Sequence, residues 1–225
     1  MRKLLAGLVA VGVSVSLSGC GTDTGTEPTT SAGATSAATT TSAGTERPNI
    51  SGPNKTINDY ITENKIAETP FKPNEPGTPD FDFPFPPGWS SAGDKTPAWA
   101  YGAIVYDQPA DPADPPAIIA IASKLAGNVE AGKILEYAPG MLKNLPDYQS
   151  VMDPEKSTLG GFDAVRSAGT YTHNGEARVI AQKTVVIPGN DALFVLQLNA
   201  DAPEGEKDVV IDAAAIIDEQ TKITP

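Results

Sequence analysis

Three consecutive strand patterns, the first two joined by a tight hairpin signal, most constrain what this chain can fold into. Residues 162–172 and 178–187 are rich in apolar and β-branched side chains, and Asn174-Gly175 lies between them. Asn-Gly is favoured in two-residue hairpin turns because both residues accept positive φ at low cost. A third strand pattern follows at residues 192–200. The sequence therefore predicts an antiparallel sheet in the second half of the chain.

Helical patterns flank these strands. The segment that begins at Thr56, with Asp59 three residues later, has the form of a capping box that opens a short helix to about residue 64. Apolar residues recur every three or four positions over residues 134–145, and Pro139 should bend or split that helix because proline lacks the backbone donor. A final helix carries its apolar stripe over residues 209–217.

Strand patterns also precede the middle helix. Three phenylalanines alternate over residues 81–85, which predicts a strand with a buried aromatic face, and further strands are expected at residues 99–106 and 117–122. Strands grouped between helices favour an antiparallel or mixed sheet over a doubly wound parallel one. We therefore expect an α+β fold, an α-β-α sandwich with a central, mainly antiparallel sheet.

The N-terminus has the pattern of a bacterial export signal. Residues 1–19 combine two basic residues with an apolar run that is too short to span a bilayer. The run ends in Leu-Ser-Gly-Cys20, which resembles the lipobox of bacterial lipoproteins, and Cys20 is the only cysteine in the chain. We expect Cys20 to become the acylated first residue of the mature protein, anchored to the membrane by its lipid (palmitate or a similar chain).

A change of composition marks the domain boundary. From Cys20 to residue 53 the chain consists largely of Thr, Ser, Ala and Gly, which cannot bury enough apolar surface to offset the loss of chain entropy. We therefore expect three parts: a signal peptide at 1–19, a lipidated cysteine with a disordered tether at 20–53, and one globular domain at 54–225.

Charge and composition exclude several kinds of function. With a formal net charge of −12, the chain lacks the excess of basic residues that nucleic-acid binding requires. The same negative charge opposes binding to anionic phospholipids. A single cysteine and a single histidine, His173, cannot supply the usual ligands of a zinc site. No nucleophile and base can be paired by a known motif. We expect no catalytic residue, no metal site and no cofactor, and hence a protein that is not an enzyme.

Aromatic residues near residue 100 are the candidate ligand contacts. If residues 99–106 form one strand, Trp99 and Tyr101 share one face, and Tyr106 lies on the other. Aromatic faces stack on sugar rings and pack against acyl chains, so Trp99, Tyr101 and Tyr106 are predicted to line a groove. The alternative is that they simply pack in the core, and the sequence leaves both readings open.

Longer blocks of sequence carry a family resemblance. These are YGAIVYDQPADPADPP (101–116), APGMLKNL (138–145), AQKTVVIP (181–188), FVLQLNA (194–200) and IDEQTKITP (217–225). In these blocks the chain closely resembles the mycobacterial LpqN/LpqT lipoprotein family. The resemblance implies a Mog1/PsbP-like fold and attachment to the outer, periplasmic face of the cell membrane in an actinobacterium. It also implies association with trehalose mycolate glycolipids, the mycolate-lipid exporter and the antigen 85 mycolyltransferases.

We therefore expect a cell-envelope lipoprotein with an accessory role in mycomembrane biogenesis. It would bind a mycolate-type trehalose glycolipid, the mycolate export and transfer machinery, or both. An uncharged sugar lipid is compatible with an acidic protein, whereas an anionic phospholipid is not. The alternative is a protein-protein adaptor that has no lipid pocket.

Overall fold

The computed structural model of the protein describes Arg47 and residues 49–225, and its centre is one large antiparallel sheet. Eight strands form it in the order β3-β4-β5-β9-β8-β7-β6, with β1 pairing with β5 beside this path. Their bounds are β1 (Ala67–Pro70), β3 (Trp89–Ser91), β4 (Gly102–Tyr106), β5 (Ala117–Ala126), β6 (Gln149–Leu159), β7 (Phe162–His173), β8 (Glu176–Pro188) and β9 (Leu193–Pro203). A separate two-stranded ribbon joins β2 (Asp80–Asp82) to β10 (Lys222–Thr224).

The long strands in the middle of the sheet follow the predicted hairpin. Strands β7 and β8 pair in register from His173 with Glu176 onward, and Asn174 and Gly175 both have positive φ, 52° and 83°. This is the turn geometry that the Asn-Gly pair favours, so the hairpin prediction is confirmed. Strand β9 then pairs with β8 along nearly its whole length.

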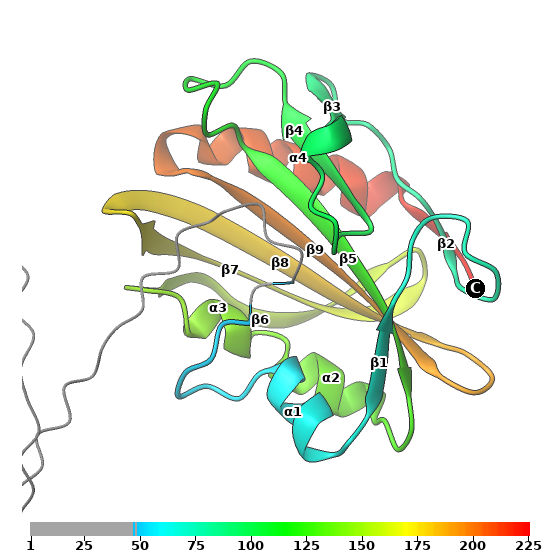
Figure 1. The fold of residues 1–225 in the computed structure, drawn as a ribbon. Coiled ribbons are helices and arrows are strands. Elements are labelled where there is room, and N and C mark those ends of the chain that lie inside the picture. The colour runs from blue at the N-terminus through cyan, green and yellow to red at the C-terminus, as the bar shows by residue number, and fades with distance from the viewer. Residues whose placement is uncertain (1–46, 48) are drawn as a thin grey trace, which may run out of the picture. The chain divides into compact units, whose positions relative to one another are not determined.

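Helices cover the two faces of the sheet (Figure 1). On one face, here called the front face, lie α1 (Ile57–Glu63), α2 (Ala131–Tyr137) and α3 (Gly140–Lys143). On the other, the back face, lies α4 (Lys207–Gln220), preceded by a 3-10 turn at Glu204–Glu206; a second 3-10 turn, Gly93–Lys95, connects β3 to β4. The α+β class and the α-β-α arrangement are therefore as the sequence predicts.

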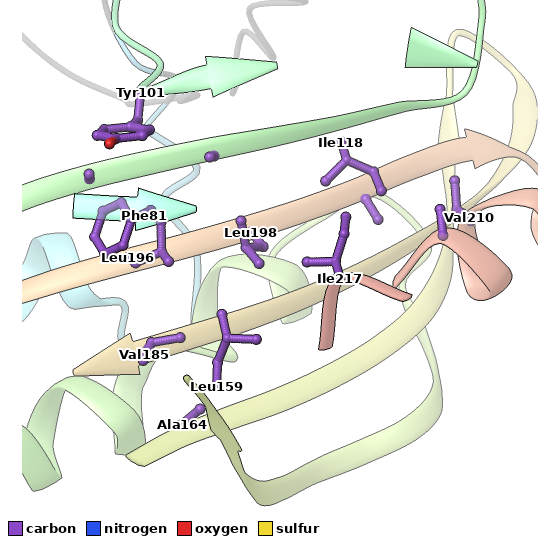
Figure 2. Packing of buried hydrophobic residues seen from close by; sticks show 14 of the residues in the cluster. Phe81, Tyr101, Ile118, Leu159, Ala164, Val185, Leu196, Leu198, Val210 and Ile217 are labelled. Atoms are coloured by element: carbon purple, nitrogen blue, oxygen red, sulfur yellow. The ribbon is translucent and has the colours of Figure 1, made fainter. Parts of the chain in front are cut away.

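Each face has its own hydrophobic core. The back core joins α4 to alternate residues of β5, β8 and β9, including Leu196, Val185 and Ile217 (Figure 2). The front core joins α1 and α2 to the intervening residues, including Ile134 and Val195. Because side chains alternate between faces along a strand, adjacent residues of β5 and β9 serve different cores. This alternation also separates a cleft on the front face from a hollow on the back face.

The predicted helices form, with one division. Thr56 caps α1 by accepting from the Asp59 amide, and the Asp59 carboxylate accepts from the Thr56 amide, so the capping box is present. The middle helix is split into α2 and α3, and Pro139 lies at the break, as its missing donor predicts. No helix in residues 49–225 is both long and apolar enough to cross a bilayer.

Two details of the strand predictions are wrong. Residues 99–101 precede β4 instead of belonging to it, because the chain turns at Ala100, whose amide donates to the carbonyl of Pro97. The aromatic alternation ends early: Phe81 is buried in β2, but Phe85 has 63% of its surface exposed. The polar edge strand β6 had no predicted counterpart.

The predicted signal peptide, Cys20 and nearly all of the predicted tether lie outside the described residues. Among the described residues, Arg47 already contacts the globular domain, several residues before the expected boundary at residue 54.

Candidate functional site

A cleft of about 210 Å³ opens on the front face, where α1 and the α2–α3 junction meet the sheet. Its walls combine apolar with neutral polar side chains and contain one acid and one base, Glu68 and Arg47. A concave site with a few placed polar groups on an apolar surface is the usual form of a small-molecule site. The main side chains are Arg47, Ile57, Glu68, Trp99, Ile121, Ser123, Met141 and Gln197.

Local sequence fixes the helical wall of this cleft. The capping box begins α1 at Ile57, which places Thr56 and Ile57 against the cleft. Gly140, at the start of α3, lets that helix approach the chain just before α1, since a Cβ there would lie 2.0 Å from the carbonyl oxygen of Lys55. Only glycine permits this close approach of two backbones. The cleft therefore has a wall built by backbone contact rather than by long side chains.

Trp99 forms the aromatic part of the cleft. It lies in the turn before β4 and is half-buried, so one part of its indole contacts the protein and the rest remains accessible. Indole faces offer a large apolar surface on which a sugar ring or an alkyl group can pack. Trp99 therefore lines a cleft, and its contact with a ligand stays a prediction.

Two buried polar side chains, Ser123 and Gln197, lie on the floor of the cleft. Ser123 of β5 is only 4% exposed, and its hydroxyl is the one buried side-chain polar atom in the described chain without a hydrogen-bond partner. Gln197 of β9 is also buried and donates from Nε2 to the Thr184 hydroxyl at 3.2 Å. A buried hydroxyl without a partner is costly, and a ligand hydroxyl in the cleft would satisfy it.

The first described residue of the chain occupies part of the cleft. The Arg47 guanidinium donates from Nη1 to Glu68 Oε1 at 3.4 Å, and from Nη2 to the side-chain oxygen of Gln197. Burial lowers the pKa of Arg47, and the Glu68 carboxylate only partly offsets that effect. Asn49 and Ile50 line the same cleft. Arg47, Asn49 and Ile50 thus line one side of the cleft, and Arg47 bonds to polar groups that a ligand could otherwise bind.

The three predicted aromatic contacts do not come together. Trp99 faces the front cleft, whereas Tyr101 is buried on the back face, where its ring lies 5.1 Å from that of Phe81, centroid to centroid. Burial, followed by the nearby Asp80 charge, raises the pKa of Tyr101. Tyr106 packs on Trp89 at 5.8 Å, at the far end of β4. The expected shared face of Trp99 and Tyr101 is wrong because the turn at residues 99–101 breaks the strand alternation.

Sequence reasoning did not find Ser123, Gln197 and Arg47. A signal for the first two was present, since each is a polar residue that directly follows an apolar run, residues 117–122 before Ser123 and 193–196 before Gln197. No comparable signal marked Arg47, which lies in the segment predicted to be a free tether.

Another group of charges lies on the front face but has a structural role. Arg178, 6% exposed, donates to Asp201 from Nε at 2.8 Å and pairs with Asp114 in the proline-rich loop before β5. Burial opposes the charge of Arg178, yet the two carboxylates raise its pKa overall. Tyr171 donates to Asp201 at 2.7 Å. These bonds hold the loop on the sheet.

His173 is the only histidine in the sequence. It ends β7 beside the hairpin turn, is exposed, and lies near Tyr171, 6.5 Å between ring centroids. In the described residues no group of three or more His, Cys, Asp or Glu side chains could hold a metal ion.

Comparison with known proteins places this chain in a family. The family model described as "Probable lipoprotein LpqN" matches residues 53–224. The "Lipoprotein LpqN" of Mycobacterium tuberculosis (strain ATCC 25618 / H37Rv) is 49% identical over 229 residues, which cover all of both chains. A solved structure, described as "Crystal structure of LpqN involved in cell envelope biogenesis of Mycobacterium tuberculosis", has a TM-score of 0.74 and 53% identity. It covers 77% of this chain and 100% of its own. From the family match and the full-length identity together, we conclude that this chain belongs to the LpqN lipoprotein family.

Proposed function

We propose that the protein is a cell-envelope lipoprotein whose front cleft binds the sugar head of a mycolate-type trehalose glycolipid. The observation that carries this proposal is the pairing of a half-buried Trp99 with the unpartnered hydroxyl of Ser123 in one cleft. Sugar recognition needs both an apolar face for the ring and hydrogen-bonding groups for its hydroxyls.

The size and charge of the cleft support an uncharged sugar head. At about 210 Å³ the cleft is smaller than the roughly 300 to 1,000 Å³ of pockets that bury a whole ligand, so it suits part of a sugar head and not a long chain. The acid and the base in the wall, Glu68 and Arg47, are paired with each other, so the cleft presents no net charge. The overall charge of −12 further disfavours an anionic phospholipid head.

Lipidation and partners complete the proposal. Acylated Cys20 anchors the protein on the periplasmic face of the cell membrane, and the domain has an accessory, non-catalytic role in envelope biogenesis. The solved relative is described as involved in that process. Delivery of a trehalose glycolipid would bring the domain into contact with the mycolate-lipid exporter and the antigen 85 mycolyltransferases, which we propose as its partners.

The test is a calorimetric titration of the wild-type domain and of Trp99→Ala with a short-chain trehalose monoester. We expect binding to wild type and a loss of at least tenfold in affinity in the variant, about 1.4 kcal/mol. Since Trp99 is only half-buried, its truncation should cost less stability than the roughly 3 to 5 kcal/mol of a core Trp. Val151→Ala, on the exposed edge strand, is the control and should bind normally. Equal binding by Trp99→Ala would refute the site, and no binding by wild type would favour the adaptor alternative.

A further inference from the structure

A second and larger hollow, of about 550 Å³, lies on the back face of the sheet. It is open to solvent and is bordered by β2, by the segment that follows β2, and by the back sides of β4, β5 and β9. Its walls are mainly aromatic and aliphatic: Phe81, Phe83, Phe85, Tyr101, Ile118 and Leu198. Figure 2 shows Tyr101, Phe81, Leu198 and Ile118 from these different elements beside one another. Most of these residues belong to the back core or pack against it.

This hollow is distinct from the front cleft. Ile121 and Gln197 line the cleft, whereas their neighbours Ala120 and Leu198 line the hollow. Adjacent residues of a strand point to opposite faces of a sheet, so the sheet itself separates the two sites. A ligand in one site does not occupy the other.

The floor of the hollow contains unfilled space. Gly102 pairs with Ala120 across β4 and β5, and a Cβ built on Gly102 meets no atom within 4 Å. Its φ is not positive, so the backbone does not demand glycine there. Glycine inside a strand weakens it and often marks a place where something else approaches closely. Here glycine leaves an apolar surface uncovered where Val or Ile would cover it.

The rim has an exposed aromatic side chain that the fold does not use. Phe85 is 63% exposed and one of three large apolar side chains in the described residues with such exposure. The ring of Phe83, two residues earlier, lies 5.8 Å from the buried ring of Phe81, centroid to centroid. An exposed aromatic residue beside an open apolar hollow is typical of a binding site.

The charges around the hollow narrow the choice of ligand. Within the described chain, its only charged lining residues are Asp80 and Asp82, both exposed and both acidic. A carboxylate or phosphate head at the mouth would meet two like charges and no cation among the lining residues. A hollow of this volume falls in the range of small-molecule pockets, about 300 to 1,000 Å³.

We propose that the back-face hollow binds the aliphatic chain of an amphiphile whose polar end carries no negative charge. Gly102 provides the room, Phe81, Phe83 and Phe85 provide the walls, and the two aspartates exclude anionic heads. This site is additional to the sugar cleft and does not depend on it. Affinity should rise with chain length, since each buried methylene adds to the apolar area removed from water.

The experiment uses the full chain with Cys20→Ser, so that the protein's own acyl chains do not compete. The probe is N-phenyl-1-naphthylamine, an uncharged fluorophore that brightens in apolar sites. Its displacement is measured with monodecanoylglycerol and with decanoate, which share a chain but differ in charge, both below their micelle concentrations. We expect saturable probe binding and displacement by the glyceride at a concentration at least tenfold lower than by decanoate.

Variants locate the site. Gly102→Val fills the floor and should weaken probe binding at least tenfold, with an unchanged or slightly raised melting midpoint. Phe85→Ala removes an exposed ring that contributes little to folding and should weaken binding severalfold. Val151→Ala and Trp99→Ala are the controls and should bind as the parent does. Wild-type binding by both Gly102→Val and Phe85→Ala, loss of binding in Trp99→Ala, or equal displacement by decanoate would each overturn the proposal.

Discussion

Arg47 competes with ligand for the cleft, and its removal should strengthen binding. Its guanidinium bonds to Glu68 and Gln197, two of the groups that could hold sugar hydroxyls. In the variant Arg47→Ala both groups become available, and no interaction has to be broken before the ligand enters. The expected effect is therefore tighter binding of a trehalose monoester.

The magnitude follows from the geometry of the Arg47 contacts. The pair with Glu68 is 3.4 Å long and its side chains are 32% and 24% exposed, which is typical of a pair worth about 0.2 to 1 kcal/mol. The hydrogen bond to Gln197 adds to this stabilisation, whereas the desolvation of the buried guanidinium, which also lowers the pKa of Arg47, reduces it. We take about 1 kcal/mol for the sum, which corresponds to roughly fivefold tighter binding.

The assay is calorimetric titration of wild type, Arg47→Ala and Arg166→Ala with the same monoester. Arg166 pairs with Glu155 at the sheet edge, away from the cleft, and its loss should leave affinity unchanged. A stability loss of about 1 kcal/mol in Arg47→Ala would lower the melting midpoint by roughly 2 to 4 °C. If Arg47→Ala bound the monoester more weakly than wild type, Arg47 would be a ligand contact, and the competition argument would be refuted.

Three further predictions concern the scaffold and the anchor. Arg178→Met should lower the free energy of unfolding by about 3 kcal/mol at neutral pH, since it leaves the Asp201 carboxylate buried without its cation. Burial raises the pKa of Asp201 above its usual 3.8, so the cost of the buried charge applies fully above the folded pKa and disappears as pH falls below 3.8. In urea unfolding the stability difference between wild type and Arg178→Met should therefore shrink on acidification. A difference that does not change with pH would contradict this. Gly140→Ala should destabilise the protein by about 1 to 3 kcal/mol because the new Cβ would meet the carbonyl oxygen of Lys55. Gly132→Ala is the control: its Cβ would meet no atom, and the better helix propensity of Ala should stabilise by roughly 1 kcal/mol. Equal effects of the two substitutions in thermal melts would count against the backbone contact between Gly140 and Lys55. Cys20→Ser should remain unacylated, and membrane fractionation that found it cleaved yet still bound would disprove the lipid anchor.

The sequence predicts the sheet and the helices where local patterns are strong. The Asn174-Gly175 turn, the capping box at Thr56 and the break at Pro139 each have a cause within a few residues, and the structure contains all three. Strand β6 lacks an apolar alternation because it is an edge strand with mostly exposed side chains and with register shifts between Ser150 and Met152 and between Met152 and Glu155. A local signal for it was the Gly160-Gly161 pair, which joins β6 to β7 and has positive φ at both residues, 57° and 88°, as in a two-residue hairpin turn.

The candidate site was predictable only in part. Trp99 was identified from residue type, but its separation from Tyr101 depends on a turn that only the paired strands define. Ser123 and Gln197 become neighbours through the pairing of β5 with β9, which are about seventy residues apart in sequence. Residue type therefore identified one member of the cleft, and topology supplied the others.

The central claim is that Trp99 contacts the sugar head of a trehalose glycolipid in the front cleft. The chain has two tryptophans, and Trp89 is buried, so Trp89→Phe leaves Trp99 as the single fluorescent reporter. Titration of this variant with a short-chain trehalose monoester should give a saturable blue shift of Trp99 emission, and a monoester of a charged sugar with the same chain should not. An emission spectrum that does not change while calorimetry detects binding, or the absence of binding by both methods, would contradict the account.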